Sequence, residues 1–209
     1  MRLFAVAILL GLVASPAYAQ ISGSAHDFKS ATWNTGAGSK NGQICGVCHI
    51  PHVEARPADR TNENLLWGRQ LSTVSYTLYT SPSLNGTTAQ PLGATRMCLG
   101  CHDGSVALEL FHTRTTGSTQ IDASARVGEG GGLTADHPVS ITYDVADIGL
   151  KATTTAWPGA AATIADVLEG GTTVQCSSCH DVHNQDVLGP SLLRVNITDS
   201  ELCLACHVK

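Results

Sequence analysis

The hydrophobic pattern of the chain shows one long apolar run at its start and no long periodic segment after it. The run extends from Leu3 to Val13, whereas later stretches such as 113–124 and 153–163 are rich in Thr, Ser, Gly and Ala. Neither stretch has the alternation of a strand or the spacing of an amphipathic helix. We therefore expect loops there, and a chain that is mostly irregular coil with a few short helices.

The first 19 residues have the layout of a secretory signal peptide. A short basic start, Met1-Arg2, precedes the apolar run, and Ala17-Tyr18-Ala19 forms a small-x-small cleavage site. A membrane anchor is the less favoured interpretation, because the run is shorter than the roughly 20 residues that a bilayer requires. We expect residues 1–19 to be removed on export and residues 20–209 to form the mature protein.

The composition indicates that ordinary side chains do not fill the whole core. Only 14% of the 209 residues are charged and 5% are aromatic, against about a quarter charged in typical globular chains. The 21 glycines and 8 prolines argue against a long helical bundle, and a formal net charge of -5 leaves no basic patch for nucleic acid. Something other than protein must contribute to the interior.

All eight cysteines fall in pairs, and each pair is followed by a histidine. The four motifs have the form CxxCH and are numbered 1 to 4 in chain order: Cys45–His49, Cys98–His102, Cys176–His180 and Cys203–His207. The cysteines concerned are Cys45, Cys48, Cys98, Cys101, Cys176, Cys179, Cys203 and Cys206. Such spacing is typical of covalent haem attachment.

Haem chemistry requires this spacing. Two thiols on one helical turn can both add to the vinyl groups of a haem, and the histidine beside the second thiol then faces the iron as its proximal ligand. The sequence therefore predicts four c-type haems, with Cys pairs as the attachment points. The proximal ligands are His49, His102, His180 and His207.

Two other uses of CxxC are less favoured. Zinc ribbons place two CxxC pairs about 15 to 20 residues apart and need no trailing histidine, whereas the gaps between pairs here are 49, 74 and 23 residues. A thioredoxin-like redox pair would require a βαβ context, which the sequence pattern does not indicate.

The remaining histidines indicate an internal duplication. One histidine precedes the first motif of each half and another follows that motif three residues after its proximal histidine, so His26 and His52 match His137 and His183. The halves are about 20–125 and 133–209, joined by a glycine-rich connection at 128–132. They would form one elongated domain, because the residues available per haem are too few for four separate domains.

The duplication predicts the second ligand of each iron. The four recurring histidines, His26, His52, His137 and His183, are the predicted distal ligands. The ninth histidine, His112, has no counterpart in the other half and is not included. Since His52 and His183 emerge on the wrong side of their own haem plane, each should reach a neighbouring haem, which would bring the four haems into a stack.

The helices expected from the sequence are short. Each CxxCH motif should begin or end a helix, 199–201 resembles a cap leading into 202–207, and 105–111 could form another turn or two. The fold class that follows is a multihaem cytochrome c, with coil and short helices wrapped around four stacked haems.

The motif set resembles the multihaem cytochromes c with doubled CXXCH motifs, and most closely the OmcE-like tetrahaem cytochromes. The resemblance rests on HDF, CxxCHxPH, Leu66-Trp67, CLGCHDG, DHPVS, CxxCHDVH and LCLACH, and it covers nearly the whole mature chain. It implies extracellular filaments of identical subunits with stacked haems, bis-histidine ligation, and one axial histidine donated by a neighbouring subunit.

Three functions are compatible with these motifs. An extracellular filament that conducts electrons to acceptors or redox partner proteins is favoured, a soluble periplasmic electron shuttle is the alternative, and a haem enzyme is least favoured because catalysis needs an iron with an open site. Because chain ends are mobile unless tied down, His26 could complete an iron site in the adjacent subunit. The competing interpretation is that His26 is a ligand within its own chain.

Overall fold

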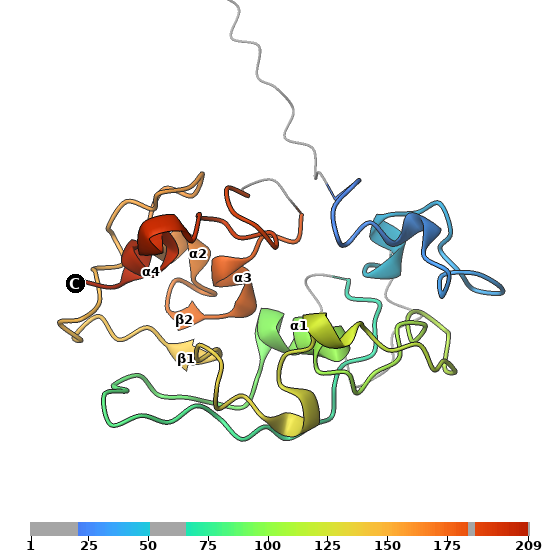
Figure 1. Cartoon of the computed structure of the whole chain (residues 1–209), viewed down its shortest axis with the longest axis horizontal. Helices are drawn as coiled ribbons and strands as arrows, with labels where there is room; N and C mark the ends of the chain where they lie inside the picture. The colour runs from blue at the N-terminus through green and yellow to red at the C-terminus, as the bar shows by residue number, and fades with distance from the viewer. Residues whose placement is uncertain (1–20, 51–65, 184–186, 209) are drawn as a thin grey trace, which may run out of the picture.

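The computed structural model describes residues 21–50, 66–183 and 187–208, and most of them are in coil and turns. The molecule is longer than it is wide, with the N-terminal segment 21–50 and the C-terminal helix at opposite sides (Figure 1). This agrees with the fold class expected from the sequence. Of the helices in the described parts of the chain, none has the length and apolar character needed to cross a membrane.

The helices are short and four of them carry the cysteine motifs. Motif 2 lies in α1, motif 3 begins α3, motif 4 lies in α4, and motif 1 begins the 3-10 helix η2. The α-helices are α1 (Gly93–His102), α2 (Ile164–Val167), α3 (Cys176–Cys179) and α4 (Glu201–Cys206). The 3-10 helices are η1 (Phe28–Ser30), η2 (Cys45–Val47), η5 (Ala123–Ala125), η6 (Glu129–Gly131) and η7 (Thr198–Ser200).

The sequence-predicted helix ends are correct at one place and wrong at another. Segment 199–201 leads into α4 as expected. Segment 105–111 is not helical, because the Asp103 carboxylate at the end of α1 accepts hydrogen bonds from the backbone and side chain of Ser105 at 2.8 Å. Gly104, with a φ of 71°, then turns the chain away from the helix axis.

Within the described residues, two clusters of buried side chains lie apart from further buried residues such as Ile50 and Phe111. The cluster in the C-terminal half contains Tyr143, Trp157, Ile164, Val167, Leu168, Val195 and Ala205, and the other contains Tyr76, Leu99 and Leu133. The strands β1 (Ile141–Thr142) and β2 (Thr173–Val174) form a two-stranded antiparallel sheet (Figure 1), and Val174 of β2 packs against the larger cluster. Such limited apolar clusters agree with the expectation from composition that side chains alone do not fill the interior.

Motif 1 is held by a short backbone ladder. The amide of Ile50 donates to the Leu66 carbonyl at 2.8 Å and the amide of Gly68 donates to the Cys48 carbonyl at 2.7 Å. His49 and Trp67 therefore lie opposite each other as an antiparallel bridge. We call this arrangement the motif 1 ladder.

Motif 3 is held by an equivalent arrangement, the motif 3 ladder. The amide of Asp181 donates to the Leu192 carbonyl at 2.9 Å, the amide of Arg194 donates to the Cys179 carbonyl at 2.8 Å, and His180 is bridged to Leu193. The turn residue also matches, since Leu192 has a φ of 61° and Leu66 in the motif 1 ladder has a φ of 48°. Motifs 1 and 3 therefore share a local backbone arrangement.

Candidate haem sites

The backbone of each CxxCH motif is folded into a helical turn. In motifs 1, 3 and 4 the histidine amide donates to the carbonyl of the first cysteine, at 2.9, 3.0 and 2.9 Å respectively. Motif 2 has helical geometry because it forms the end of α1. The turn places the two thiols of a motif on one side and the histidine next to them, which is the arrangement that covalent haem attachment requires.

The motifs of the two halves meet where α1 packs against α3. The amide of Cys176 donates to the Thr95 hydroxyl at 3.1 Å, and Thr95 is fully buried. The thiols of Cys98 and Cys176 are hydrogen bonded, and this bond together with burial raises the pKa of Cys98. At Cys176 the same bond lowers the pKa to about 7, against the opposing effect of burial. Attachment points of motifs 2 and 3 are thus in direct contact.

The second cysteines of motifs 1 and 3, Cys48 and Cys179, are half-buried residues beside an arginine. Burial raises the pKa of Cys48 and of Cys179 to about 11. Arg69 opposes this shift at Cys48, and Arg194 does so at Cys179. Motifs 1 and 3 therefore each have a cation close to the second cysteine. The ladder geometry brings the arginine there, and no sequence motif indicates it.

The structure brings six histidines together as three ring pairs. The ring centroids are 6.2 Å apart in the pair His26 and His102, and 6.4 Å apart in the other two pairs. Those two pairs are His49 with His183 and His137 with His207. Each pair consists of one predicted proximal and one predicted distal ligand.

These spacings fit the two axial positions of one iron. Imidazole nitrogens bind metals at about 2 Å, so two rings on opposite sides of one metal have centroids roughly 6 Å apart. In the described residues no group of three or more His, Cys, Asp or Glu side chains could hold a metal ion. A pair of histidines suits haem iron, because the porphyrin supplies the remaining ligands.

Hydrogen bonds fix the proton position on three of the predicted ligand rings, two from the ring pairs and that of His180. The Nδ1 atoms of His102, His180 and His137 lie 2.7, 2.9 and 3.0 Å from the backbone carbonyls of Ala125, Ser191 and Pro138. A carbonyl only accepts hydrogen bonds, so Nδ1 carries the proton and Nε2 keeps its lone pair. These rings are oriented to bind a metal through Nε2.

Desolvation lowers the pKa of two of the predicted distal ligands, His26 and His137. Burial, followed by the neighbouring His102 and His180, lowers the pKa of His26 to about 4. Burial also lowers the pKa of His137. Only the neutral imidazole has a lone pair for a metal, so a lowered pKa favours the form of each side chain that ligation requires.

The other predicted positions have different outcomes. His52 lies outside the described residues. His180 is close enough to His26 to affect its pKa, but no described histidine ring faces it at the spacing of the three pairs. His112, which was not predicted as a ligand, lies with its Nε2 3.1 Å from the His49 carbonyl and so supports the backbone of motif 1.

The sequence reasoning missed a buried carboxylate beside the second haem motif. Asp103 directly follows His102, is 2% exposed, and accepts hydrogen bonds from Ser72, Ser105 and the Tyr76 hydroxyl, the last at 2.5 Å. Burial and this hydrogen bond raise the pKa of Tyr76. The available signal was the CHD sequence, which occurs in both motif 2 and motif 3.

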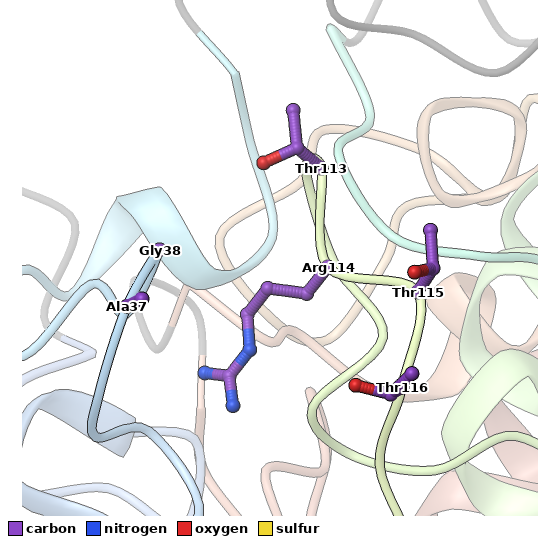
Figure 2. Close-up of a pocket in the computed structure, with 6 residues that line it drawn as sticks. All are labelled: Ala37, Gly38, Thr113, Arg114, Thr115 and Thr116. Carbon is purple, nitrogen blue, oxygen red and sulfur yellow. The ribbon is translucent and has the colours of Figure 1, made fainter.

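An open polar depression lies away from the cysteine motifs. It has a volume of about 360 Å³ and is lined by Ala37, Gly38, Thr113, Arg114, Thr115 and Thr116. Figure 2 shows the Arg114 side chain extending into it between the two segments. None of the predicted haem ligands lines it, so it is not one of the candidate haem sites.

Comparison with known families agrees with the cysteine motifs. Residues 168–209 match the family described as "Doubled CXXCH motif", and this segment contains motifs 3 and 4. No curated protein and no solved structure matches the chain. The CxxCH motifs indicate c-type haem binding, and the match supports a multihaem c-type cytochrome that carries electrons.

Proposed function

We propose that the protein carries four bis-histidine c-type haems and is the repeating subunit of an extracellular filament that conducts electrons. The observation that carries the proposal is the set of three histidine pairs with ring centroids 6.2 to 6.4 Å apart. Bound haem supplies reversible one-electron exchange at its iron. Two histidines on an iron leave no open position for substrate, which favours electron transfer over a haem enzyme.

The chain's own residues hold and orient the haems in this proposal. The cysteine pairs attach each haem covalently, and the carbonyls of Ala125, Ser191 and Pro138 orient ligand rings through Nδ1. The contact between Cys98 and Cys176 supports close approach of haems 2 and 3. Electrons would then cross between the two halves at the junction of α1 and α3.

The equivalence of the two ladders suggests the fourth ligand pair. His183, three residues after the proximal His180, faces His49 of the other half. By the same relation His52, three residues after His49, would serve the iron of His180. Since His26 lies beside His102 of its own chain, the structure favours ligation by His26 within the chain over the predicted link to an adjacent subunit.

The resemblance implies that one axial histidine is exchanged between subunits, and the other three pairs form within one chain. We therefore place the His52 and His180 pair between adjacent subunits, with His52 of one subunit serving the iron of His180 in the next. Apolar side chains at the C-terminal side of the molecule support a subunit contact there, because Ile148 is 96% exposed and Val208 is 53% exposed. The two segments are joined by a hydrogen bond from the Val208 amide to the Gly149 carbonyl at 2.8 Å. Adjacent exposed apolar side chains are typical of interaction surfaces.

Electron microscopy of the secreted fraction tests the proposal. We expect filaments, a chain that begins at Gln20, and a mass that includes four haems. A protein found only as single particles in the periplasm would instead support the alternative, a soluble electron shuttle. Fewer than four haems would contradict the predicted number of cofactors.

Two matched variants test the assignment of the subunit link. His52→Ala should give protomers with one high-spin iron, because the link and the ligand are lost together. His26→Ala should also give one high-spin iron, but filaments should still form. Normal filaments in His52→Ala, or their loss only in His26→Ala, would contradict the assignment.

A further inference from the structure

Two buried hydrogen-bond donors at the motif 1 ladder have no acceptor among the residues that the structure describes. They are the indole Nε1 of Trp67 and the guanidinium Nε of Arg69. Arg69 is 3% exposed. A buried cation and a buried donor are both costly unless a partner compensates them. These two atoms therefore indicate a group that accepts hydrogen bonds and carries negative charge.

The contacts of Arg69 account for only part of its bonding capacity. Its Nη2 donates to the Leu108 carbonyl at 3.0 Å, and its Cζ lies 5.9 and 5.6 Å from the ring centroids of Trp33 and Phe111. The rings attract the cation but offer no acceptor to Nε. Within the described parts of the chain, no carboxylate lies at ion-pair distance from Arg69.

The ladder places both donors beside motif 1. The Trp67 ring meets the His49 ring edge-on, with centroids 5.7 Å apart. The charge of Arg69 acts on the Cys48 thiol, where it opposes the rise in pKa caused by burial. Residues two apart in an extended segment share a face, so Trp67 and Arg69 lie on the same side of the ladder.

We propose that Arg69 and Trp67 bind a propionate carboxylate of the haem attached to Cys45 and Cys48. This inference rests on the proposed function, because it requires a haem at motif 1. Propionates are the carboxylate groups of haem, and a guanidinium matches carboxylate geometry while an indole can only donate. A positive charge that neutralises one propionate stabilises the reduced form of the nearby iron relative to its oxidised form. The reduction potential of that haem therefore rises.

The test compares the four haem potentials in variants of the complete haem-loaded protein. Arg69→Met should shift one of the four potentials to a more negative value. Arg69→Lys should shift the same potential much less, because it keeps the positive charge. Trp67→Phe keeps the ring but loses the donor, so it should shift the same potential by a smaller amount. Resonance Raman spectra should show a changed propionate bending band in all three variants.

Arg114→Met is the matched control. The Cζ of Arg114 lies 5.2 Å from the same Phe111 ring, but its side chain extends into the open depression rather than into the interior (Figure 2). This variant removes a cation from the same ring without removing either unpartnered donor. All four potentials and the propionate band should remain those of the unaltered protein.

The outcomes separate this inference from a purely structural role. An Arg69→Met protein that keeps four haems, unchanged potentials and an unchanged propionate band would overturn it, even if its melting temperature fell. Equal shifts in Arg69→Met and Arg114→Met would also overturn it. If Arg69→Met does not accumulate, Trp67→Phe provides the test. An unchanged propionate band and unchanged potentials in Trp67→Phe would then overturn the inference. Absence of haem from motif 1 in the unaltered protein would contradict the proposed function itself.

Discussion

The motif 1 and motif 3 ladders share a backbone but differ in the side chains around it. Gly68 and Arg194 occupy equivalent positions, since their amides donate to the Cys48 and Cys179 carbonyls. A Cβ at Gly68 would lie 2.7 Å from Cγ2 of Ile50, whereas Arg194 has room to donate from Nε to the Ser177 carbonyl at 2.9 Å. The backbone therefore follows the CxxCH motif, and the neighbouring side chains give each motif its own environment.

This difference bears on the cations near the motifs. Arg69 is buried with one donor unpartnered, while Arg194 is half-buried and uses its Nε in a hydrogen bond to its own ladder. The two haems would then differ in potential although their attachment geometry is the same. Such differences arise from burial and hydrogen bonding around equivalent ligands.

The largest expected effect comes from removing the ligand that links the halves. His183→Ala should leave four haems attached but make one of the four irons high-spin, because His183 faces His49 in the other half. Electron paramagnetic resonance and carbon monoxide binding measure this. His112→Ala is the control and should keep every iron low-spin. Low-spin iron throughout in His183→Ala would show that the ring pair is not an axial pair.

Filling the space at Gly68 should destabilise the motif 1 ladder. Gly68→Ala places a methyl group against Ile50 and within 3.1 Å of the His112 ring, and such overpacking costs about 1 to 3 kcal/mol. Thermal unfolding followed in the haem absorption band measures the loss. Unchanged stability would show that a side chain fits at position 68 as it does at the equivalent position 194. It would contradict the difference in packing between the two ladders.

The contact between halves should depend on one buried hydroxyl. Thr95→Val leaves the Cys176 amide without its acceptor, and we expect a loss of about 1 kcal/mol, at the lower end for an unsatisfied buried donor. Denaturant unfolding gives the value, with Thr95→Ser as a control that retains the hydroxyl. If valine and serine have equal effects, packing rather than the hydrogen bond holds α1 to α3.

The smallest effect is expected at Arg194. Arg194→Ala removes the hydrogen bond to the Ser177 carbonyl in a half-buried position, which should cost about 0.5 kcal/mol. The same unfolding measurement, made beside Gly68→Ala, compares equivalent positions of the two ladders. If Arg194→Ala lost more stability than Gly68→Ala, the motif 3 ladder would be the more sensitive of the two, contrary to this prediction.

Much of the candidate site could be predicted from local sequence. The CxxCH motifs define attachment points and proximal ligands without reference to the fold, because two thiols and an imidazole on one turn are sufficient for the chemistry. The repeat led to His26, His137 and His183 as predicted distal ligands, and the ring of each lies beside that of a predicted proximal ligand. Helical segment 105–111 was wrongly expected, since the Asp103 side chain competes for the backbone there.

Only the tertiary structure decided which histidines meet. Sequence order places His183 three residues after His180, yet its ring faces His49, and His26 faces His102 rather than the nearer motif 1. It also decided that Arg69 is buried beside Cys48. The sequence by itself determined the covalent chemistry, because that chemistry depends on spacing within one turn. Pairing of ligands and placement of charges depend on packing between segments far apart in the chain, which no local pattern records.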